Sequence, residues 1–280
     1  ADAGQSAEAM ALFRKALPQL PLFNPGLTRA AALFQRDGLL DEAKALYQKI
    51  LVNNPYDPNA AFELAKMDLD AGQTAPAVAR LQSVLEGAPE FTPARVNLGV
   101  GFERLGRFDD AVEAYETALR LDPGAVAAML NLARLYEASS RMAEAERLLR
   151  RAVDASRQSP DCSAALHDFF VRGGQPLDAA QFWTTLAASR PLDVAERVRH
   201  AFALALAGDM DSATDMIDAL PEDGDRAALH AGLQAVEAWL DVKPAAAIAP
   251  LDQLAASRNP HAAVARHTLL AAFMFELKRN

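Results

Sequence analysis

The sequence is poor in cysteine and in aromatic residues. Cys162 is its single cysteine, which excludes an intrachain disulfide and any metal cluster built from cysteines. Aromatic residues make up 7% of the chain, whereas β-rich folds favour aromatic and β-branched side chains. Alanine, the strongest helix former, is abundant instead. The composition therefore favours an all-α fold.

Long apolar runs are also missing. The longest, such as Ala201–Ala207 and Leu269–Phe275, fall far short of the ~20 residues that span a bilayer. We therefore expect no direct membrane insertion and a soluble protein of the cytoplasm or the periplasm, two compartments between which the sequence does not choose. The chain begins with Ala1 and shows no charged segment followed by an apolar one, so we expect that any signal peptide was removed or never belonged to it.

Positive charge is in deficit. Lysine and arginine number 28 against 37 aspartate and glutamate residues, which gives a formal net charge of −9 at pH 7. Nucleic acids and anionic membranes attract basic surfaces, so this balance opposes binding to either. Few aromatic side chains are available to stack on bases. Nucleic acid is therefore not an expected partner.

Sequence signatures of catalysis and of metal binding are absent. The five histidines form no HExxH pattern, and the chain has no GxSxG, no GxxxxGK(S/T) and no strand-linked GxGxxG motif. Cys162 and His167 lie five residues apart, but packing or helix capping is the simpler role for His167 and His200. We therefore expect no metal ion, no cofactor and no catalytic residue, and hence a protein that is not an enzyme.

What the sequence does contain is an internal repeat of 34 residues. Alanine recurs at this step at Ala9, Ala43, Ala77, Ala111, Ala145, Ala179, Ala213 and Ala247. A glycine column keeps the same step at Gly4, Gly38, Gly72, Gly106, Gly174 and Gly208, with Ser140 as the exception. A bulky column includes Tyr47, Leu81, Tyr115 and Trp183, and a small column includes Ala65, Gly99 and Ala133 but has His167 as its exception. Such a fixed period is typical of stacked repeats.

Each repeat is predicted to form two helices, which we name helix A and helix B. Residues 95–105 place apolar or small residues on one helical face, and the residues after Gly106 do so again. Glycine allows the tight turn between the two helices, and a proline column stops helix B. The residues predicted to cap a helix A, each next to a proline, are Asn24, Asp57, Thr92 and Ser159.

This pattern resembles the tetratricopeptide repeat (TPR) family. The family combines a small residue in helix A, a turn glycine, an alanine early in helix B, a large apolar residue four positions later and a final proline. The best match is RVNLGVGFERLGRFDDAVEAYETALRLDP at residues 95–123, and the resemblance covers nearly the whole chain. It implies an all-α solenoid, a right-handed superhelix of antiparallel helix pairs with a 34-residue period.

The register divides the chain into three parts. Residues 1–23 are predicted to be a half repeat, with helix B only, and a connection; residues 262–280 are predicted to be a C-terminal capping helix over the open end. Between them we expect seven TPR units, at 24–57, 58–91, 92–125, 126–159, 160–193, 194–227 and 228–261, the last one degenerate because Val242 replaces the turn glycine. A repeat array normally starts with a polar cap, so the missing first helix A indicates a piece of a longer repeat protein.

The resemblance places the binding surface on a concave side lined by helix A. The site residues that it implies are Arg29, Arg36, Phe62, Lys66, Leu69, Val96, Asn97, Val100, Arg104, Leu130, Asn131, Arg134, Arg172 and Arg199. The apolar members suit an extended peptide or a helix, and packing between repeats is an equal alternative. The basic members could attract acidic segments, whereas their acidic neighbours favour a mixed, solvated face.

Two functions fit this pattern. The first is a non-catalytic scaffold or adaptor that binds a peptide or helix of another protein. Asn97 and Asn131, at one position of successive repeats, could then hold a peptide backbone, and they resemble two rungs of the asparagine ladder in O-GlcNAc transferases. The second is a substrate-recruiting TPR arm of a larger enzyme or of a secretion or polysaccharide-export assembly, with further domains in the same longer chain. In both cases the partner is a protein or peptide segment whose identity the sequence does not show.

Overall fold

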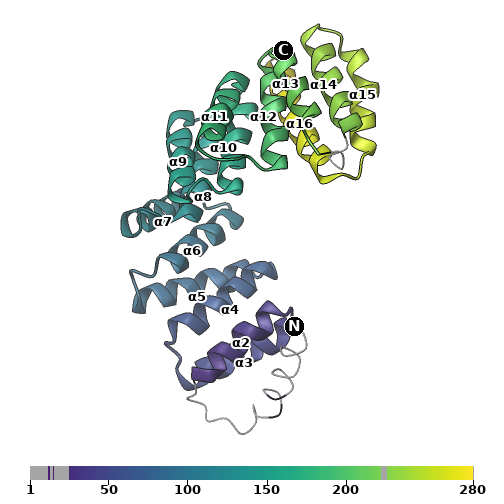
Figure 1. The fold of residues 1–280 in the computed structure, drawn as a ribbon. Helices are drawn as coiled ribbons and strands as arrows, with labels where there is room; N and C mark the ends of the chain where they lie inside the picture. The colour runs from purple at the N-terminus through teal and green to yellow at the C-terminus, as the bar shows by residue number, and fades with distance from the viewer. Residues whose placement is uncertain (1–11, 13–14, 16–24, 222–225, 280) are drawn as a thin grey trace. The chain divides into compact units, whose positions relative to one another are not determined.

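The computed structural model describes residues 12, 15, 25–221 and 226–279, and helices are the regular secondary structure of this part of the chain (Figure 1). Apart from two isolated positions, the predicted half repeat at residues 1–23 lies outside the described residues. The predicted cap Asn24 lies outside them too.

The helices fall into two compact units, residues 1–141 and 142–280. The first unit holds α2 (Pro25–Arg36), α3 (Leu40–Asn53), α4 (Pro58–Asp70), α5 (Thr74–Gly87), α6 (Thr92–Arg104), α7 (Phe108–Leu121) and α8 (Val126–Ala138). The second unit holds α9 (Met142–Ala155), α10 (Pro160–Arg172), α11 (Pro176–Ser189), α12 (Val194–Leu206), α13 (Met210–Asp218), α14 (Arg226–Leu240), α15 (Pro244–Ala256) and α16 (Pro260–Arg279).

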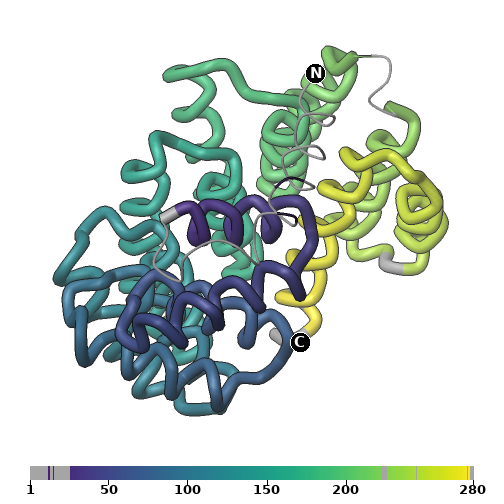
Figure 2. The backbone as a smooth tube through the Cα atoms, turned by 90° about the horizontal axis from the view of Figure 1, so that it is seen from below, coloured from purple at the N-terminus to yellow at the C-terminus, as the bar shows by residue number. Residues whose placement is uncertain are grey.

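Successive helices pair as the repeat predicts. Within the first unit α2 packs on α3, α4 on α5 and α6 on α7, and each pair packs on the next helix. The backbone runs back and forth through each pair (Figure 2). Helix A begins at Pro58, Thr92, Val126, Pro160 and Val194, a constant step of 34 residues. The predicted class, an all-α solenoid with this period, is therefore confirmed.

The glycine column marks the turn from helix A to helix B. Its described glycines, from Gly38 to Gly208, all have positive φ, between 66° and 95°. Glycine adopts this left-handed conformation without the steric cost that a Cβ brings. Ser140 (φ 60°) and Val242 (φ 59°) adopt it as well, at the two column positions that lack glycine. The turn geometry therefore persists in every described repeat, with backbone strain at these two residues.

The alanine and bulky columns form the interior. From Ala43 to Ala213 every alanine of the first column is 0% exposed, as are Tyr115 and Trp183 of the bulky column. A Cβ on Gly99 would lie 2.5 Å from Cε1 of Tyr115. The small column is therefore small because a side chain of helix B fills the space next to it.

Two of the predicted helix caps are confirmed and one is wrong. The side chains of Asp57 and Ser159 accept hydrogen bonds from backbone N–H groups in the first turns of α4 and α10. Thr92 is instead the first helical residue of α6, and Phe91 occupies the capping position. The Phe91 side chain has no hydrogen-bond acceptor, so α6 begins without a side-chain cap.

The last helix, α16, contacts helices much earlier in the chain, in addition to those that a helix covering the end of the array would contact. α16 contacts α14 and α15, as the next helix A of an array does. It also packs against α10 and, most extensively, against α12, which are helices A of earlier repeats. The segment predicted to be a capping helix, residues 262–280, lies largely within α16, and α16 covers the side of the second unit that its helices A form.

Candidate protein-binding surface

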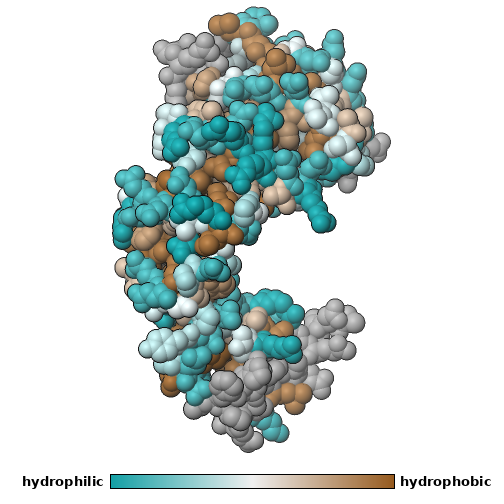
Figure 3. All heavy atoms as spheres, turned by 90° about the vertical axis from the view of Figure 1, so that its left-hand side faces the viewer, coloured by the Kyte–Doolittle hydropathy of each residue, from teal (hydrophilic) through white to brown (hydrophobic). Residues whose placement is uncertain are grey.

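The residues predicted to bind a partner lie on the helices A, and we call the side of each unit that these helices form the helix A face. In the first unit it comprises α2, α4, α6 and α8, with α4 and α8 both in contact with α6. On the molecular surface drawn in Figure 3, hydrophilic residues predominate, with apolar patches between them. The predicted site residues include both kinds.

Two of the apolar side chains predicted to contact a partner are buried. Leu69 of α4 is 3% exposed and Val96 of α6 is 9% exposed. The Leu69 side chain comes within 3.8 Å of the point where Gly101 of α6 would carry a Cβ. Packing between repeats, the alternative that the sequence left open, therefore accounts for Leu69. Neither presents a surface to a partner.

Three other apolar side chains are partly exposed: Phe62 of α4, Val100 of α6 and Leu130 of α8. They occur on three successive helices A. Phe62 makes an edge-to-face contact with Phe91, with the ring centroids 5.1 Å apart, and the ammonium group of Lys66 lies 5.4 Å from the Phe62 centroid. Partly exposed apolar groups on adjacent helices form a surface that can bury more area against a partner.

Polar side chains of this face are joined in two similar networks. In the first, the Tyr47 hydroxyl donates to Gln35 Oε1 at 3.3 Å, and Gln35 Nε2 donates to Glu63 Oε2 at 3.3 Å. Lys66 Nζ lies 2.9 Å from the same Glu63 oxygen. This network links the first described helix pair with helix A of the next repeat.

The second network repeats the arrangement two repeats further along. The Tyr115 hydroxyl donates to Glu103 Oε1 at 2.6 Å, and Arg134 pairs with the other oxygen of Glu103. Asn131 also hydrogen-bonds Tyr115. Burial, together with the hydrogen bond to Glu103, raises the pKa of the Tyr115 hydroxyl above its ordinary value. The phenol therefore stays protonated and donates at physiological pH.

The two asparagines predicted to hold a peptide backbone make contacts within the protein. Asn97 Nδ2 donates to the Pro93 carbonyl oxygen at 2.9 Å, one turn earlier in α6. Asn131 contacts Tyr115. An amide engaged in this way has fewer donors and acceptors left for a ligand, so the geometry favours a structural role for both side chains.

The basic side chains of the first unit are largely paired. Arg36 lies 2.9 Å from the carboxylate of the adjacent aspartate, and Lys66 and Arg134 take part in the two networks. The Arg104 guanidinium donates to the Leu69 carbonyl oxygen, and Arg29 is exposed. Paired surface charges contribute little net attraction. The mixed face is therefore favoured over a basic lining.

In the second unit α16 covers the helix A face. Arg172 of α10 is exposed and Arg199 of α12 is half-buried. On the covering helix, His267 Nε2 lies 3.5 Å from Asp168 Oδ2 of α10. Sequence reasoning missed this cover, because a helix that ends an array and a helix that folds back onto it can have the same apolar pattern.

A buried histidine connects α10, α11 and α16. His167 is 0% exposed at its position in the small column. Trp183 Nε1, which can only donate, bonds His167 Nδ1 at 3.0 Å, so the imidazole proton lies on Nε2, 3.2 Å from Thr268 Oγ1. Burial lowers the pKa of His167 to about 3, and the nearby charge of Arg199 adds to this effect. The ring is therefore neutral and structural at physiological pH.

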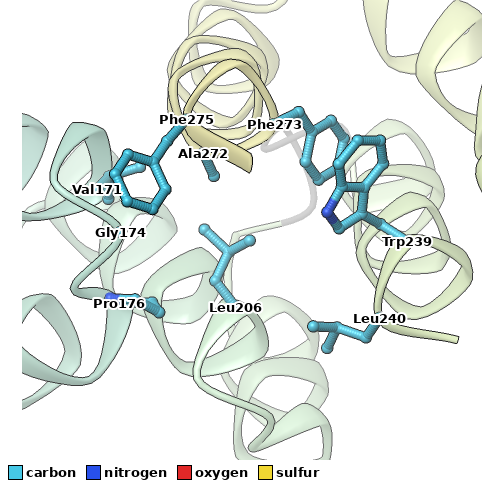
Figure 4. A pocket seen from close by; sticks show the side chains of 9 residues that line it. All are labelled: Val171, Gly174, Pro176, Leu206, Trp239, Leu240, Ala272, Phe273 and Phe275. Atoms are coloured by element: carbon cyan, nitrogen blue, oxygen red, sulfur yellow. The ribbon is translucent and has the colours of Figure 1, made fainter. Parts of the chain in front are cut away.

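A cavity of about 270 Å³ lies at one end of this interface. In Figure 4 α16 passes above it, with the turn after α10 on one side, Leu206 of α12 below and the end of α14 on the other side. Phe273 stacks on Trp239 with the ring centroids 4.2 Å apart, and Phe275 leaves no room for a Cβ on Gly174. All of the lining residues are apolar or glycine, so none can act as an acid, a base or a nucleophile.

The described residues hold no group of three or more histidine, cysteine, aspartate or glutamate side chains placed to bind a metal ion. None of their helices combines the length and the apolar character that crossing a bilayer requires. Cys162 is buried at the start of α10, and the ring nitrogens of His167 contact Trp183 and Thr268.

Comparison with known proteins agrees with this architecture. A family model described as tetratricopeptide repeat matches residues 96–160, which overlap the best-conforming repeat of the chain. These residues therefore resemble the tetratricopeptide repeat, and the described helices follow the same 34-residue step. TPR proteins are typically non-catalytic scaffolds, and the TPR fold implies protein partners.

Two solved TPR structures share the fold. A TPR protein from Parabacteroides merdae ATCC 43184 superposes with a TM-score of 0.55 at 15% identity, covering 91% of this chain and 98% of its own. A thermophilic TPR protein from Thermus thermophilus superposes with a TM-score of 0.52 at 23% identity, covering 64% of this chain and 97% of its own. At these identities the likeness concerns the fold alone.

One similar protein has a named role. Cellulose synthase operon protein C of Pseudomonas fluorescens (strain SBW25) is 31% identical over 168 residues, which cover 57% of this chain. The match spans 13% of the length of that protein. The matched part of this chain therefore corresponds to a small part of that protein.

Proposed function

We propose that this TPR chain is a non-catalytic scaffold that binds a peptide or a helix of another protein on the helix A face of its first unit. The observation that carries the proposal is the row of partly exposed apolar side chains, Phe62, Val100 and Leu130, on three successive helices A. Each Å² of apolar surface that a partner buries there stabilises the complex by roughly 25 cal/mol before the cost of association.

The charged side chains around this row indicate which kind of partner segment fits it. The Glu63 and Glu103 networks place carboxylates and cations side by side along the helices A. A strongly acidic or strongly basic segment would therefore meet like charges as well as opposite ones. A segment with apolar residues at regular spacing and charges of both signs fits this face best.

Substitutions on the helices A test the proposal, and substitutions on the helices B serve as the control. We expect Phe62→Ala combined with Leu130→Ala to reduce capture of the native partner at least about tenfold, because apolar contact area is lost. The matched control is Val52→Ala combined with Leu121→Ala, which removes exposed apolar side chains from helices B. Affinity capture with quantitative mass spectrometry compares both variants with the parent chain, after their melting temperatures have been matched. Equal recovery of every partner by all three proteins would contradict the proposal.

The alternative function is a TPR arm of a larger enzyme or of a secretion or polysaccharide-export assembly. The 31% identity to cellulose synthase operon protein C is compatible with it and does not favour it over an independent adaptor. The same helix A face would then receive a substrate or a neighbouring component. The sequence of the complete gene product separates the two functions, because a catalytic or membrane domain on the same polypeptide would support the arm.

A further inference from the structure

We propose that α16 is a displaceable ligand of its own solenoid: it occupies a helix-binding groove formed by α10, α12 and α14, and a partner helix of the same chemistry takes its place. The inference rests on the proposed function for the kind of partner. It goes beyond that function by assigning a second groove, its resident helix and the residue pattern that the groove accepts.

The course of α16 follows the helix A face. Thr268 meets His167 of α10, and Phe275 meets Gly174 at the end of the same helix. From 268 to 275 and from 167 to 174 the step is the same, so α16 runs parallel to α10 over this stretch. It also packs on α12 and α14. Three helices A therefore share one long helix, which is the geometry of a helix bound in a groove.

The buried side of α16 shows what the groove accepts. Ala262, Ala265, Leu269 and Phe273 are at most 6% exposed, and their spacing of i, i+3, i+7 and i+11 puts them on one helical face. The two alanines allow close approach of the helix backbones, and Phe273 stacks on Trp239. Thr268 adds a hydroxyl opposite His167. The matching partner is an amphipathic helix with two small residues, a hydroxyl residue, a leucine and an aromatic residue in this order.

The contact beneath α16 is polar for a permanent interior. It contains the buried pair of His167 and Thr268. The Asp168–His267 pair lies at the edge of the contact, where the His267 side chain is 65% exposed. At the small-column position of His167 the repeats of the first unit carry alanine or glycine. Both ring nitrogens of His167 are hydrogen-bonded while α16 is in place, and after displacement of α16 Nε2 and the Thr268 hydroxyl can bond to water instead, so opening this contact leaves no polar group without a partner. Interfaces that open are accordingly more polar than permanent cores.

The fit of α16 is also incomplete. The cavity of about 270 Å³ lies between α16, the turn after α10, α12 and α14, and its apolar lining lacks the close packing that is usual in protein interiors. The side chains that line such a space lose van der Waals contacts. A partner helix with larger side chains near the positions of Ala272 and Phe275 would fill the cavity and compete with α16.

Hydrogen exchange on the full, unmodified chain gives the first test. We expect amides in the middle of α16 to exchange at least about tenfold faster than those of α12 and α14, through an opening that leaves the other helices of the unit folded. Exchange of α16 in the same cooperative step as α12 and α14 would overturn the proposal, because α16 would then be an inseparable part of the core.

Peptide binding gives the second test. Substitution of a buried leucine of α16 is the test, and substitution of the exposed leucine next to it is the control. Leu269 is 0% exposed under α16, and Leu270 is 53% exposed on its outer side. We expect a fluorescent peptide of residues 260–279 to bind the full chain carrying Leu269→Ala at least about tenfold more tightly than the parent chain or the chain carrying Leu270→Ala, because the resident helix is weakened.

Two results would overturn the proposal. One is equal peptide affinity of all three chains, and the other is unfolding of α12 and α14 in the Leu269→Ala chain, which circular dichroism and hydrogen exchange detect. Neither result bears on the first unit, because capture of a partner through Phe62 and Leu130 is measured on different helices. Failure of this inference is thus distinguishable from failure of the proposed function.

Discussion

Gly99 of α6 faces the fully buried ring of Tyr115, and a Cβ there would lie 2.5 Å from Cε1. We expect Gly99→Ala to destabilise the protein by about 1–3 kcal/mol, because overpacking exceeds the gain of roughly 1 kcal/mol in helix propensity. Urea denaturation measures the change. Gly87, the last residue of α5, has open space at its Cβ position, so Gly87→Ala should be neutral or stabilising. Equal effects at both sites would refute the contact with Tyr115.

The turns between helices A and B offer a second test at single residues. Val242 and Ser140 have positive φ where the column otherwise carries glycine. We expect Val242→Gly to stabilise the protein by about 1–2 kcal/mol and Ser140→Gly by less, because the left-handed conformation is most costly for a β-branched residue. Denaturant titration measures both changes.

Gly106→Ala makes the opposite change, from glycine to a residue with a Cβ, at the same turn position of another repeat, and serves as the control. No atom lies within 4 Å of its Cβ position, so a loss of about 1 kcal/mol would report backbone strain alone. If Val242→Gly lowered the stability instead, the positive φ of this turn would not be the source of strain.

At the scale of helices, the bulky residue of helix B and one position of helix A match in polarity in the first three described repeats. Buried Tyr47 and Tyr115 have the polar partners Gln35 and Glu103, each twelve positions earlier. In the repeat between them the same two columns hold a pair of buried leucines, at 69 and 81. A buried hydroxyl requires an acceptor, whereas leucine requires none. In these three repeats the residue of helix B thus matches the polarity of helix A at this point, whereas in the next repeat Leu149 is buried and the helix A position holds Glu137.

A double-mutant cycle tests this pairing. We expect Glu103→Leu to cost about 1–3 kcal/mol, because the buried Tyr115 hydroxyl loses its acceptor, and Tyr115→Phe to cost about 1 kcal/mol. The double variant should cost less than the sum of the two, since neither polar group is then left without its partner. Urea denaturation of the four proteins measures the coupling. Additive costs would show that the hydroxyl and the carboxylate do not stabilise each other.

The contact between α10 and α16 should make stability depend on pH. Folding lowers the pKa of His167 from 6.5 to about 3, so below pH 6.5 the unfolded or opened form binds a proton and the closed form does not. Stability present above pH 6.5 is therefore lost as pH falls towards 3, by about 1 kcal/mol at pH 5.5. The charged and titratable groups that act on the ring are Arg172 of α10, Arg199 and His200 of α12 and His267 of α16.

Measurement at pH 7.5 and 5.5 isolates this effect. Burial raises the pKa of the Asp168 carboxyl, so at lower pH the folded state binds that proton more readily and the trend opposes that of His167. Burial also lowers the pKa of His200, which acts in the same direction as His167. We expect His167→Gln to leave only the opposing parts due to His200 and Asp168, and hence a smaller loss of stability at pH 5.5 than in the parent chain. If the variant kept the full pH dependence of the parent chain, His167 would not be the titrating group.

At the scale of the whole molecule, packing is mostly between helices that are neighbours in sequence, with α16 as the main exception. Arrays of this kind distribute stability over local units rather than one core. We expect Leu64→Ala, at a position that is 1% exposed in α4, to cost about 2–5 kcal/mol. Hydrogen exchange should then speed up in α2 to α5 while α12 and α14 keep their protection. A uniform loss of protection in both units would indicate a single two-state transition.

The sequence predicted the helices better than it predicted the surface. Asp57 caps a helix as expected, because a cap depends on residues within one turn. Thr92 does not, since the chain enters α6 one residue earlier than the Thr-Pro pair implies. Leu69 and Val96 were predicted to face a partner and are buried. Both lie on a helix side whose exposure depends on how closely the next repeat approaches.

The sequence by itself determined the helix pair, its 34-residue step and the left-handed turn at each glycine position, because these follow from contacts within one repeat. Only the tertiary structure decided which helix A positions remain exposed and that α16 lies across α10 and α12. His167 and Thr268 are 101 residues apart in the chain, and a periodic pattern holds no information about a contact at that separation. That contact depends on how successive repeats stack, which is a property of the folded array.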